Sequence, residues 1–307
     1  MTTVARPRQP VLRDLLDDCT RRTGSPIEAR WMAEQALGCK PGALVTRLGD
    51  PVTDEVRRTL DTWLARREAG EPLQYVLGSW PFRSLELVVD RRVLIPRPET
   101  EAVAGFALDV ITATKAGAVE SGGDPTGGRR VVDLGTGSGA IALSLAAEGP
   151  TDLEIWATDR SADALVVARA NLAALARRDD SSARRVRLAE GSWFDAVPAE
   201  LAGAFSLVVS NPPYVSEGEW TRLDPVVRDY EPRQALVAGG RGLDAILEIV
   251  DRSPWWLVAG GHIVIELAPH QADVAASAAS SAGYGDIEIK DDLTGRPRVL
   301  VATWPGP

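Results

Sequence analysis

The first 70 residues repeat apolar side chains at the three- and four-residue spacing of amphipathic helices. Residues 11–18, 27–37 and 54–69 each show this pattern. The third stretch is preceded by Thr53, a favoured N-cap residue, and followed by Gly70, a favoured terminator. The pattern predicts a small helical bundle. Taken by itself, such a bundle would serve equally well as a packing or dimerisation module.

After residue 73 the pattern changes to apolar residues at every second position. Leu85, Leu87 and Val89 follow this spacing, which predicts a strand or hairpin between two domains. Residues 102–112 return to a helical pattern. Residues 115–130 are rich in glycine and predict a surface loop.

From residue 130 onward, strand and helix patterns alternate, which indicates a mostly parallel sheet with helices on both faces. The linker at residues 290–297 is too short for a parallel crossover, so the last two strands should be antiparallel. The predicted strands are 130–134, 153–158, 186–189, 205–210, 262–267, 286–289 and 298–303, and the predicted helices are 140–147, 162–177, 242–251 and 271–282.

Composition is typical of a globular protein, and 307 residues suffice for a large domain and a small one. No apolar run reaches the length of a membrane span, and the N-terminus lacks the apolar core of a signal peptide. Cys19 and Cys39 are too few for a disulfide framework, and His262 and His270 have no metal-ligand spacing. We therefore expect a cytoplasmic protein without a metal site or membrane attachment.

The net charge of -9 is unevenly distributed. Residues 1–85 hold 13 Lys and Arg against 11 Asp and Glu, a balance of +2, whereas the remainder has a balance of -11. A protein that binds a nucleic-acid duplex by itself usually presents a strongly basic face. The charge weighs against direct nucleic-acid binding but leaves room for a local basic patch.

A glycine-rich turn follows the first strand of the alternating region. Val131 to Leu134 lead into Gly135-Thr136-Gly137-Ser138-Gly139 and a helix, an arrangement that lets the backbone approach a ligand closely. Asp159 ends the next strand, where a carboxylate can accept hydrogen bonds from ribose hydroxyls. The G-x-G-x-G spacing favours S-adenosylmethionine over a dinucleotide, whose pyrophosphate prefers G-x-G-x-x-G. A purely structural turn is the third interpretation.

The tetrapeptide Asn211-Pro212-Pro213-Tyr214 follows the apolar strand 205–210, at the sheet edge where ligands bind in open α/β folds. An amide or exocyclic amine nitrogen is a poor nucleophile and must be aligned with the methyl group. The Asn211 side-chain oxygen can accept one N–H, and the Pro212 carbonyl, held by two prolines, can accept the other. Tyr214 offers a flat face for a planar group. A rigid proline turn without a ligand is the alternative.

These motifs resemble the HemK-type glutamine N5-methyltransferases that modify peptide chain release factors. The resemblance runs from about residue 71 to 301. It implies a class I, Rossmann-like α/β fold in which a small helical N-terminal domain is joined by a β-hairpin to a seven-strand methyltransferase sheet. The segments that carry it are Glu71 to Tyr75, Ile95 to Glu101, Asp133 to Gly139, Asn211 to Tyr214, Tyr230-Glu231-Pro232, Gly239-Gly240 and Gly242-Leu243.

The resemblance also implies roles for individual residues. Residues 1–75 would recognise the substrate, 76–95 would form the hairpin linker, and 96–307 would be the methyltransferase domain. Asn211, Pro212, Pro213 and Tyr214 would hold the glutamine of a Gly-Gly-Gln loop and form the catalytic site, with Asn211 also near the cofactor. Arg97 to Glu101 would flank the cleft. The S-adenosylmethionine site would comprise Gly135, Thr136, Gly137, Ser138, Gly139, Asp159 and Trp193, although Trp193 alone could be a core aromatic.

The sequence departs from the family pattern at three places. Ser192 replaces an acidic residue and so lacks a carboxylate that could contact adenine. Ala268 replaces a glycine. Trp80-Pro81-Phe82 departs from the usual phenylalanine and glycine pattern.

Three other functions remain open. The first is that of a sister enzyme, which methylates a glutamine of a ribosomal protein. An adenine N6 DNA methyltransferase shares Asn-Pro-Pro-Tyr but needs basic surface for duplex and base flipping. A non-catalytic RNA-binding or assembly factor could be built on the same fold. The sequence favours a monomer that acts on release factors.

Overall fold

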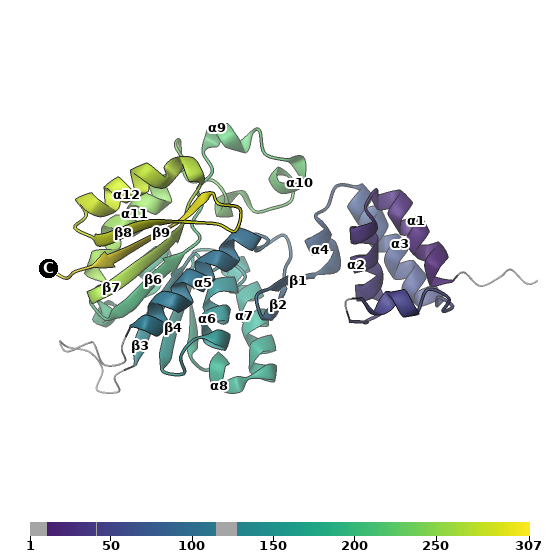
Figure 1. Ribbon diagram of the computed structural model, residues 1–307, viewed down its shortest axis with the longest axis horizontal. Coiled ribbons are helices and arrows are strands. Elements are labelled where there is room, and N and C mark those ends of the chain that lie inside the picture. Colours follow the sequence, from purple (N-terminus) through teal and green to yellow (C-terminus); the bar gives the residue numbers. More distant parts are fainter. Residues whose placement is uncertain (1–10, 41, 115–127) are drawn as a thin grey trace, which may run out of the picture. The chain divides into compact units, whose positions relative to one another are not determined.

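The structure is a computed structural model that describes residues 11–40, 42–114 and 128–307 (Figure 1). The chain divides into two compact units. The first comprises Met1–Gly78 and Pro225–Tyr230, and the second comprises Ser79–Asp224 and Glu231–Pro307. Most of the predicted glycine-rich loop, residues 115–127, lies outside the described residues.

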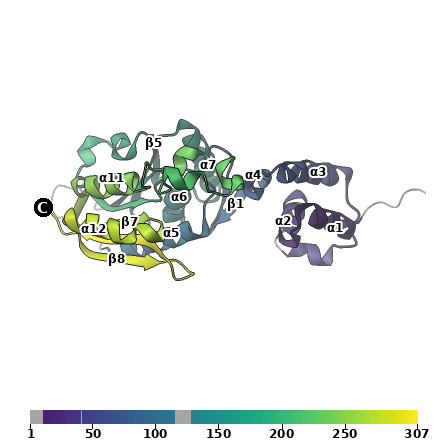
Figure 2. The same cartoon turned by 90° about the horizontal axis from the view of Figure 1, so that it is seen from above.

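The first unit is helical, as the apolar spacing predicted. Its helices α1, α2 and α3 pack on one another (Figure 2) around buried side chains such as Leu15, Met32 and Leu60. Thr53 caps α3 by accepting the Val56 N–H at 3.3 Å. The elements are α1 (Leu12–Thr23), α2 (Pro26–Ala36), the 3₁₀ helix η1 (Ala43–Thr46), α3 (Asp54–Glu68), α4 (Leu73–Leu77) and α10 (Pro225–Arg228); the sequence pattern did not predict η1, α4 or α10.

Two sets of hydrogen bonds hold the residues that follow α3 in place. Arg66 makes two hydrogen bonds of 2.9 Å to the carboxylate of the buried Glu71 and also donates to the Tyr75 and Val76 carbonyls. The Tyr230 hydroxyl donates to the Ala69 carbonyl at 2.6 Å. The first unit therefore includes a segment that follows Ala69 by about 160 residues in the chain.

The second unit confirms the predicted hairpin and seven-strand sheet. Its strand order is β5-β4-β3-β6-β7-β9-β8, in which β9 runs antiparallel to both neighbours, as predicted for the final pair. The hairpin is β1 (Ser79–Phe82) and β2 (Leu85–Val88), and the sheet strands are β3 (Arg129–Leu134), β4 (Leu153–Asp159), β5 (Val186–Glu190), β6 (Phe205–Ser210), β7 (Leu257–Glu266), β8 (Gly285–Asp291) and β9 (Pro297–Trp304).

Helices cover both faces of this sheet (Figure 1). Apolar residues of α5, α6 and α7 bury one face, and those of α11 and α12 bury the other. The bounds are α5 (Pro98–Ala113), α6 (Ala140–Glu148), α7 (Ala162–Arg178), α8 (Asp180–Ala183), α9 (Glu217–Trp220), α11 (Asp244–Arg252) and α12 (Ala272–Ser281), with 3₁₀ turns η2 (Trp193–Ala196), η3 (Ala199–Leu201), η4 (Arg233–Ala235), η5 (Ser253–Trp255) and η6 (Pro269–Gln271).

The parallel strands end in polar residues at one edge of the sheet. Asp159 and Glu266 end β4 and β7, Asp133 is the penultimate residue of β3, and Asn211 directly follows β6. Because carboxyl ends of parallel strands share an edge, these four side chains come from distant parts of the sequence to one region. In the part of the chain that the structure describes, no helix is long and apolar enough to cross a membrane.

Candidate active site

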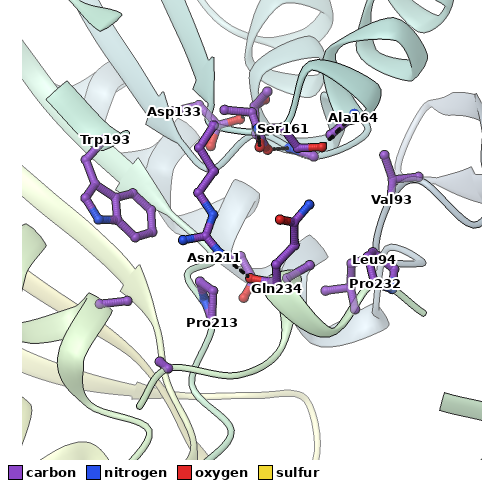
Figure 3. A pocket seen from close by; sticks show the side chains of 18 of the residues that line it. Val93, Leu94, Asp133, Ser161, Ala164, Trp193, Asn211, Pro213, Pro232 and Gln234 are labelled. Carbon is purple, nitrogen blue, oxygen red and sulfur yellow. Dashed lines mark hydrogen bonds between the residues drawn. The ribbon is translucent and has the colours of Figure 1, made fainter. Parts of the chain in front are cut away.

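A cavity of about 320 Å³ lies within the second unit, at the edge where the parallel strands end (Figure 3). Figure 3 shows Trp193 on one side of it and Val93 and Leu94 on the other. Its volume suits a small-molecule ligand. Of the predicted site residues, the lining includes Gly135, Thr136, Gly137, Ser138, Asp159, Trp193, Asn211 and Pro213, but not Gly139, Pro212 or Tyr214.

The glycine turn is held by backbone hydrogen bonds that it donates to the neighbouring strand β4. The N–H groups of Gly135 and Thr136 both donate to the Thr158 carbonyl, at 2.9 and 2.8 Å. Gly135 has a φ of +72°, and a Cβ there would lie 3.3 Å from the Trp193 ring. Gly139, which has a φ of +86°, is the N-cap residue of α6, and a Cβ there would lie 3.0 Å from the Leu143 side chain. Gly139 therefore shapes the turn rather than lining the cavity.

Asp133 is a buried acid in the cavity wall, and it was predicted only as part of the motif that precedes the glycine turn. Its Oδ2 accepts hydrogen bonds from the Thr136 hydroxyl at 2.6 Å and the Ala142 N–H at 3.1 Å. Its Oδ1 is buried and has no hydrogen-bond partner among the described residues. Burial raises the pKa of Asp133 to about 7. An isolated buried carboxylate oxygen of this kind favours a cationic ligand.

Asp159 connects the glycine turn to the start of α7. Its two carboxylate oxygens accept the Gly137 N–H at 2.9 Å and the Ser161 N–H at 2.8 Å. Burial raises the pKa of Asp159 above its ordinary value. Each oxygen retains a second lone pair that can accept a ligand hydroxyl. The carboxylate therefore braces the turn as well as facing the cavity.

Trp193 is fixed in an unusual backbone conformation, with a φ of +48°. Its indole N–H donates to Glu248 at 3.1 Å, and its carbonyl accepts from the Thr158 hydroxyl at 3.0 Å. Both Glu248 and the family departure Ser192 line the cavity. The carboxylate of Glu248, from α11, therefore lies beside the wall that the Trp193 ring forms.

Asn211 is oriented by its neighbours. Its amide nitrogen donates to the Thr100 hydroxyl at 2.9 Å, and the Thr100 hydroxyl donates to Glu266 at 2.7 Å. The Asn211 Oδ1 is buried and has no hydrogen-bond partner within residues 11–40, 42–114 and 128–307. Because Asn211 lines the cavity, this oxygen can accept an N–H from a bound molecule.

The rest of the tetrapeptide is rigid. The Tyr214 hydroxyl donates to Glu266 at 3.3 Å, and the Tyr214 carbonyl accepts from Gln271 at 2.9 Å. Burial raises the pKa of Tyr214, so its hydroxyl stays protonated near neutral pH. Only Asn211 and Pro213 of the tetrapeptide line the cavity itself.

The segment 95–101 is anchored by a buried acid. Glu231 accepts the Ile95 N–H at 3.0 Å and forms an ion pair with Arg97, and burial raises the Glu231 pKa. Of this segment, Pro96 and Thr100 line the cavity. Arg97, expected to flank the cleft, thus holds the segment in place.

The structure accommodates the family departure at Ala268. Ala268 has a φ of -78°, which any residue adopts, so the position does not require glycine. Its N–H donates to the Gln271 side chain at 3.0 Å. In the hairpin departure, Phe82 is fully buried in the core.

Glu266 and Glu248 were not among the predicted site residues, and Thr100 was predicted only as part of the segment Arg97 to Glu101 that flanks the cleft. A signal existed for Glu266, since it ends an apolar strand as Asp133 and Asp159 do. In the part of the chain that the structure describes, no group of three or more His, Cys, Asp and Glu is placed to hold a metal ion.

Comparison with known proteins bears on this site and fold. Residues 20–78 match a family model described as PrmC N-terminal domain, and residues 123–230 match one described as Methyltransferase small domain. The catalytic domain of hMettl16 shares the fold, with a TM-score of 0.51 at 16% identity over 82% of each chain. The match to the methyltransferase family model, together with the glycine turn, identifies the class of protein as a methyltransferase.

Two relatives identify the family within the methyltransferases. The release factor glutamine methyltransferase of Deinococcus radiodurans is 37% identical over 95% of this chain and 98% of its own. The one from Burkholderia pseudomallei is also 37% identical, over 91% of this chain and 92% of its own. The chain belongs to the release factor glutamine methyltransferase family.

Proposed function

We propose that the protein transfers a methyl group from S-adenosylmethionine to the side-chain amide nitrogen, N5, of the glutamine in the Gly-Gly-Gln loop of peptide chain release factors. One observation supports this most directly. The Asn211 Oδ1 is a buried, unpaired acceptor in the same cavity as the glycine turn. A substrate amide N–H would satisfy it.

The cavity suits a cationic methyl donor. S-adenosylmethionine carries a sulfonium and an α-ammonium group, and Asp133 and Asp159 both line the cavity. The unpaired Asp133 Oδ1 can accept from the ammonium, and the Asp159 carboxylate can accept from ribose hydroxyls. A dinucleotide would bring a pyrophosphate next to the buried Asp133, which is electrostatically unfavourable. When bound, the donor supplies an electrophilic methyl group.

The residues that follow β6 would align the acceptor nitrogen. Asn211 Oδ1 would accept one N–H of the glutamine amide. Pro212 itself does not line the cavity, but it stands between Asn211 and Pro213, which do, and its carbonyl would accept the other N–H. In the transfer, the amide nitrogen forms the new C–N bond and the donor's C–S bond breaks. The methylated amide is then strongly acidic and passes its extra proton to water. Prepared hydrogen-bond acceptors of this kind stabilise the charge that develops on the nitrogen as it reacts. No strongly basic group is required.

The remaining expectations follow from this assignment. The partner is a release factor, whose glutamine loop enters the cavity, and the setting is the cytoplasm, where release factors act. We propose that the protein acts as a monomer. We also propose that it does not bind nucleic acid directly, because its net charge of -9 repels the phosphate backbone.

A single experiment separates the candidate functions. The protein is incubated with methyl-labelled S-adenosylmethionine and, in turn, release factor, ribosomal subunits and DNA. Label in the glutamine of the release factor supports the proposal. Label only in ribosomal protein would identify the sister activity, label only in DNA would identify an adenine methyltransferase, and no label with any substrate would point to a non-catalytic factor.

A further inference from the structure

The strongest unassigned feature of the second unit is a buried chain of hydrogen bonds behind Asn211. It runs from Glu266 at the end of β7, through Thr100 in the first turn of α5, to the Asn211 amide, with distances of 2.7 and 2.9 Å. Glu266 and Thr100 are almost completely buried. The other Glu266 oxygen accepts the Tyr214 hydroxyl at 3.3 Å. Glu266 therefore contacts one end of the tetrapeptide directly and the other through Thr100.

The donors and acceptors in this chain can be arranged in one way when Glu266 is ionised. A carboxylate only accepts, so the single hydroxyl proton of Thr100 points to Glu266. Thr100 then offers Asn211 only lone pairs. The Asn211 NH₂ group must face Thr100, which leaves the carbonyl oxygen facing the cavity. The oxygen and nitrogen ends of an amide are nearly alike in shape, so packing alone does not fix which end faces the cavity. The hydrogen-bond network does fix it.

We propose that Glu266 and Thr100 are positioning residues for methyl transfer, which fix the Asn211 amide with its oxygen toward the substrate nitrogen. The opposite orientation would present the Asn211 NH₂ group to the NH₂ group of the glutamine, donor against donor. It would also leave the Asn211 oxygen against the Thr100 lone pairs. The inference rests on the proposed function, because it assumes that Asn211 holds the acceptor amide.

The first test is Thr100→Val, which keeps the shape of the side chain but removes the hydroxyl. We expect kcat for methylation of a whole release factor to fall about 10- to 100-fold, while S-adenosylmethionine affinity stays within twofold. Thr100→Ser restores a hydroxyl and should recover most of the rate. Thr114→Val is the matched control, because among the described residues this hydroxyl bonds only to the Val110 carbonyl, at the other end of α5.

A double mutant separates positioning from structural support. If Thr100 acts through Asn211, Thr100→Val should reduce the residual single-turnover rate less than threefold further in an Asn211→Ala background. Equal losses in both backgrounds would overturn the proposal, as would Thr100→Val turnover within threefold of the parent. If Asn211→Ala itself retains turnover, the proposed role of Asn211 fails instead, so the two failures are distinguishable.

The second test uses pH. Burial raises the pKa of Glu266 to about 7, although Thr100, Arg298 of β9 and the Tyr214 hydroxyl favour its ionised form; the nearby Glu99 of α5 opposes it. Below that pH, protonated Glu266 becomes a donor, and the amide loses its fixed orientation. We expect kcat to fall as the pH drops through about 7.

Glu266→Gln should mimic the protonated state, with a low kcat that lacks this inflection. Calorimetric S-adenosylmethionine binding and thermal unfolding confirm that the variant is folded. An unchanged inflection with a normal kcat in Glu266→Gln would overturn the role of Glu266.

Discussion

Replacing Asp159 with alanine is expected to weaken S-adenosylmethionine binding by about 10- to 150-fold. The magnitude follows from one lost charge-assisted hydrogen bond to the ribose, which is worth about 1.5–3 kcal/mol, at about 1.4 kcal/mol per tenfold change. The structure adds a second effect. The Gly137 and Ser161 N–H groups, at 2.9 and 2.8 Å from the carboxylate, would lose their acceptor and loosen the turn.

Titration calorimetry with S-adenosylmethionine measures this loss, and thermal unfolding confirms that the variant is folded. Asp152→Ala is the matched control. Asp152 directly precedes the opposite end of β4 and pairs with Arg129 rather than lining the cavity. An affinity within twofold of the parent for Asp159→Ala would remove Asp159 from the cofactor site, and an equal loss in Asp152→Ala would indicate general destabilisation.

Three further predictions concern the substrate, the donor and the first unit. Asn211→Ala should lower turnover about 100-fold or more while calorimetric donor affinity stays nearly unchanged; turnover within threefold of the parent would contradict its role. Because burial raises the pKa of Asp133 to about 7 and the ionised form attracts the donor's ammonium, affinity should rise by up to about tenfold per pH unit between pH 5.5 and 7, and Asp133→Asn should abolish that rise. Deleting residues 1–78 should impair methylation of a whole release factor far more than that of a short glutamine peptide. Only the whole release factor can bind the first unit at a place remote from its glutamine, and the deletion removes that binding energy. The truncated protein must first be shown to bind donor, and equal losses on both substrates would refute a recognition role.

Most of the second unit could be predicted because its elements follow local rules. Apolar runs such as 205–210 and the glycine turn at 135–139 carry their own signals, and the edge rule then brings Asp133, Asp159 and Asn211 together. The antiparallel final pair followed from linker length alone. The short helices α4 and α10 were missed, because four or five residues are too few to show a period.

The partners within the site could not be predicted in the same way. Thr100 and Glu266 are 166 residues apart, and Trp193 and Glu248 are 55 apart. Nothing in the spacing of either pair indicates contact, since their proximity depends on the order of strands and the packing of α5 and α11 on the sheet. The sequence therefore indicated residues that line the cavity, whereas the residues that orient them could be found only from the fold.

The place of Tyr230 in the first unit has a consequence for how the protein is made. Residues 12–77 are synthesised before Tyr230, whose hydroxyl donates to the Ala69 carbonyl and which follows Ala69 by about 160 residues. Until then, the nascent helical unit exposes the surface that Pro225–Tyr230 covers. Synthesis at about 5–20 residues per second leaves it in this state for roughly 8–30 seconds. The first unit therefore gains its last segment only after strands β1 to β6 have been synthesised, which ties the maturation of the first unit to that of the second.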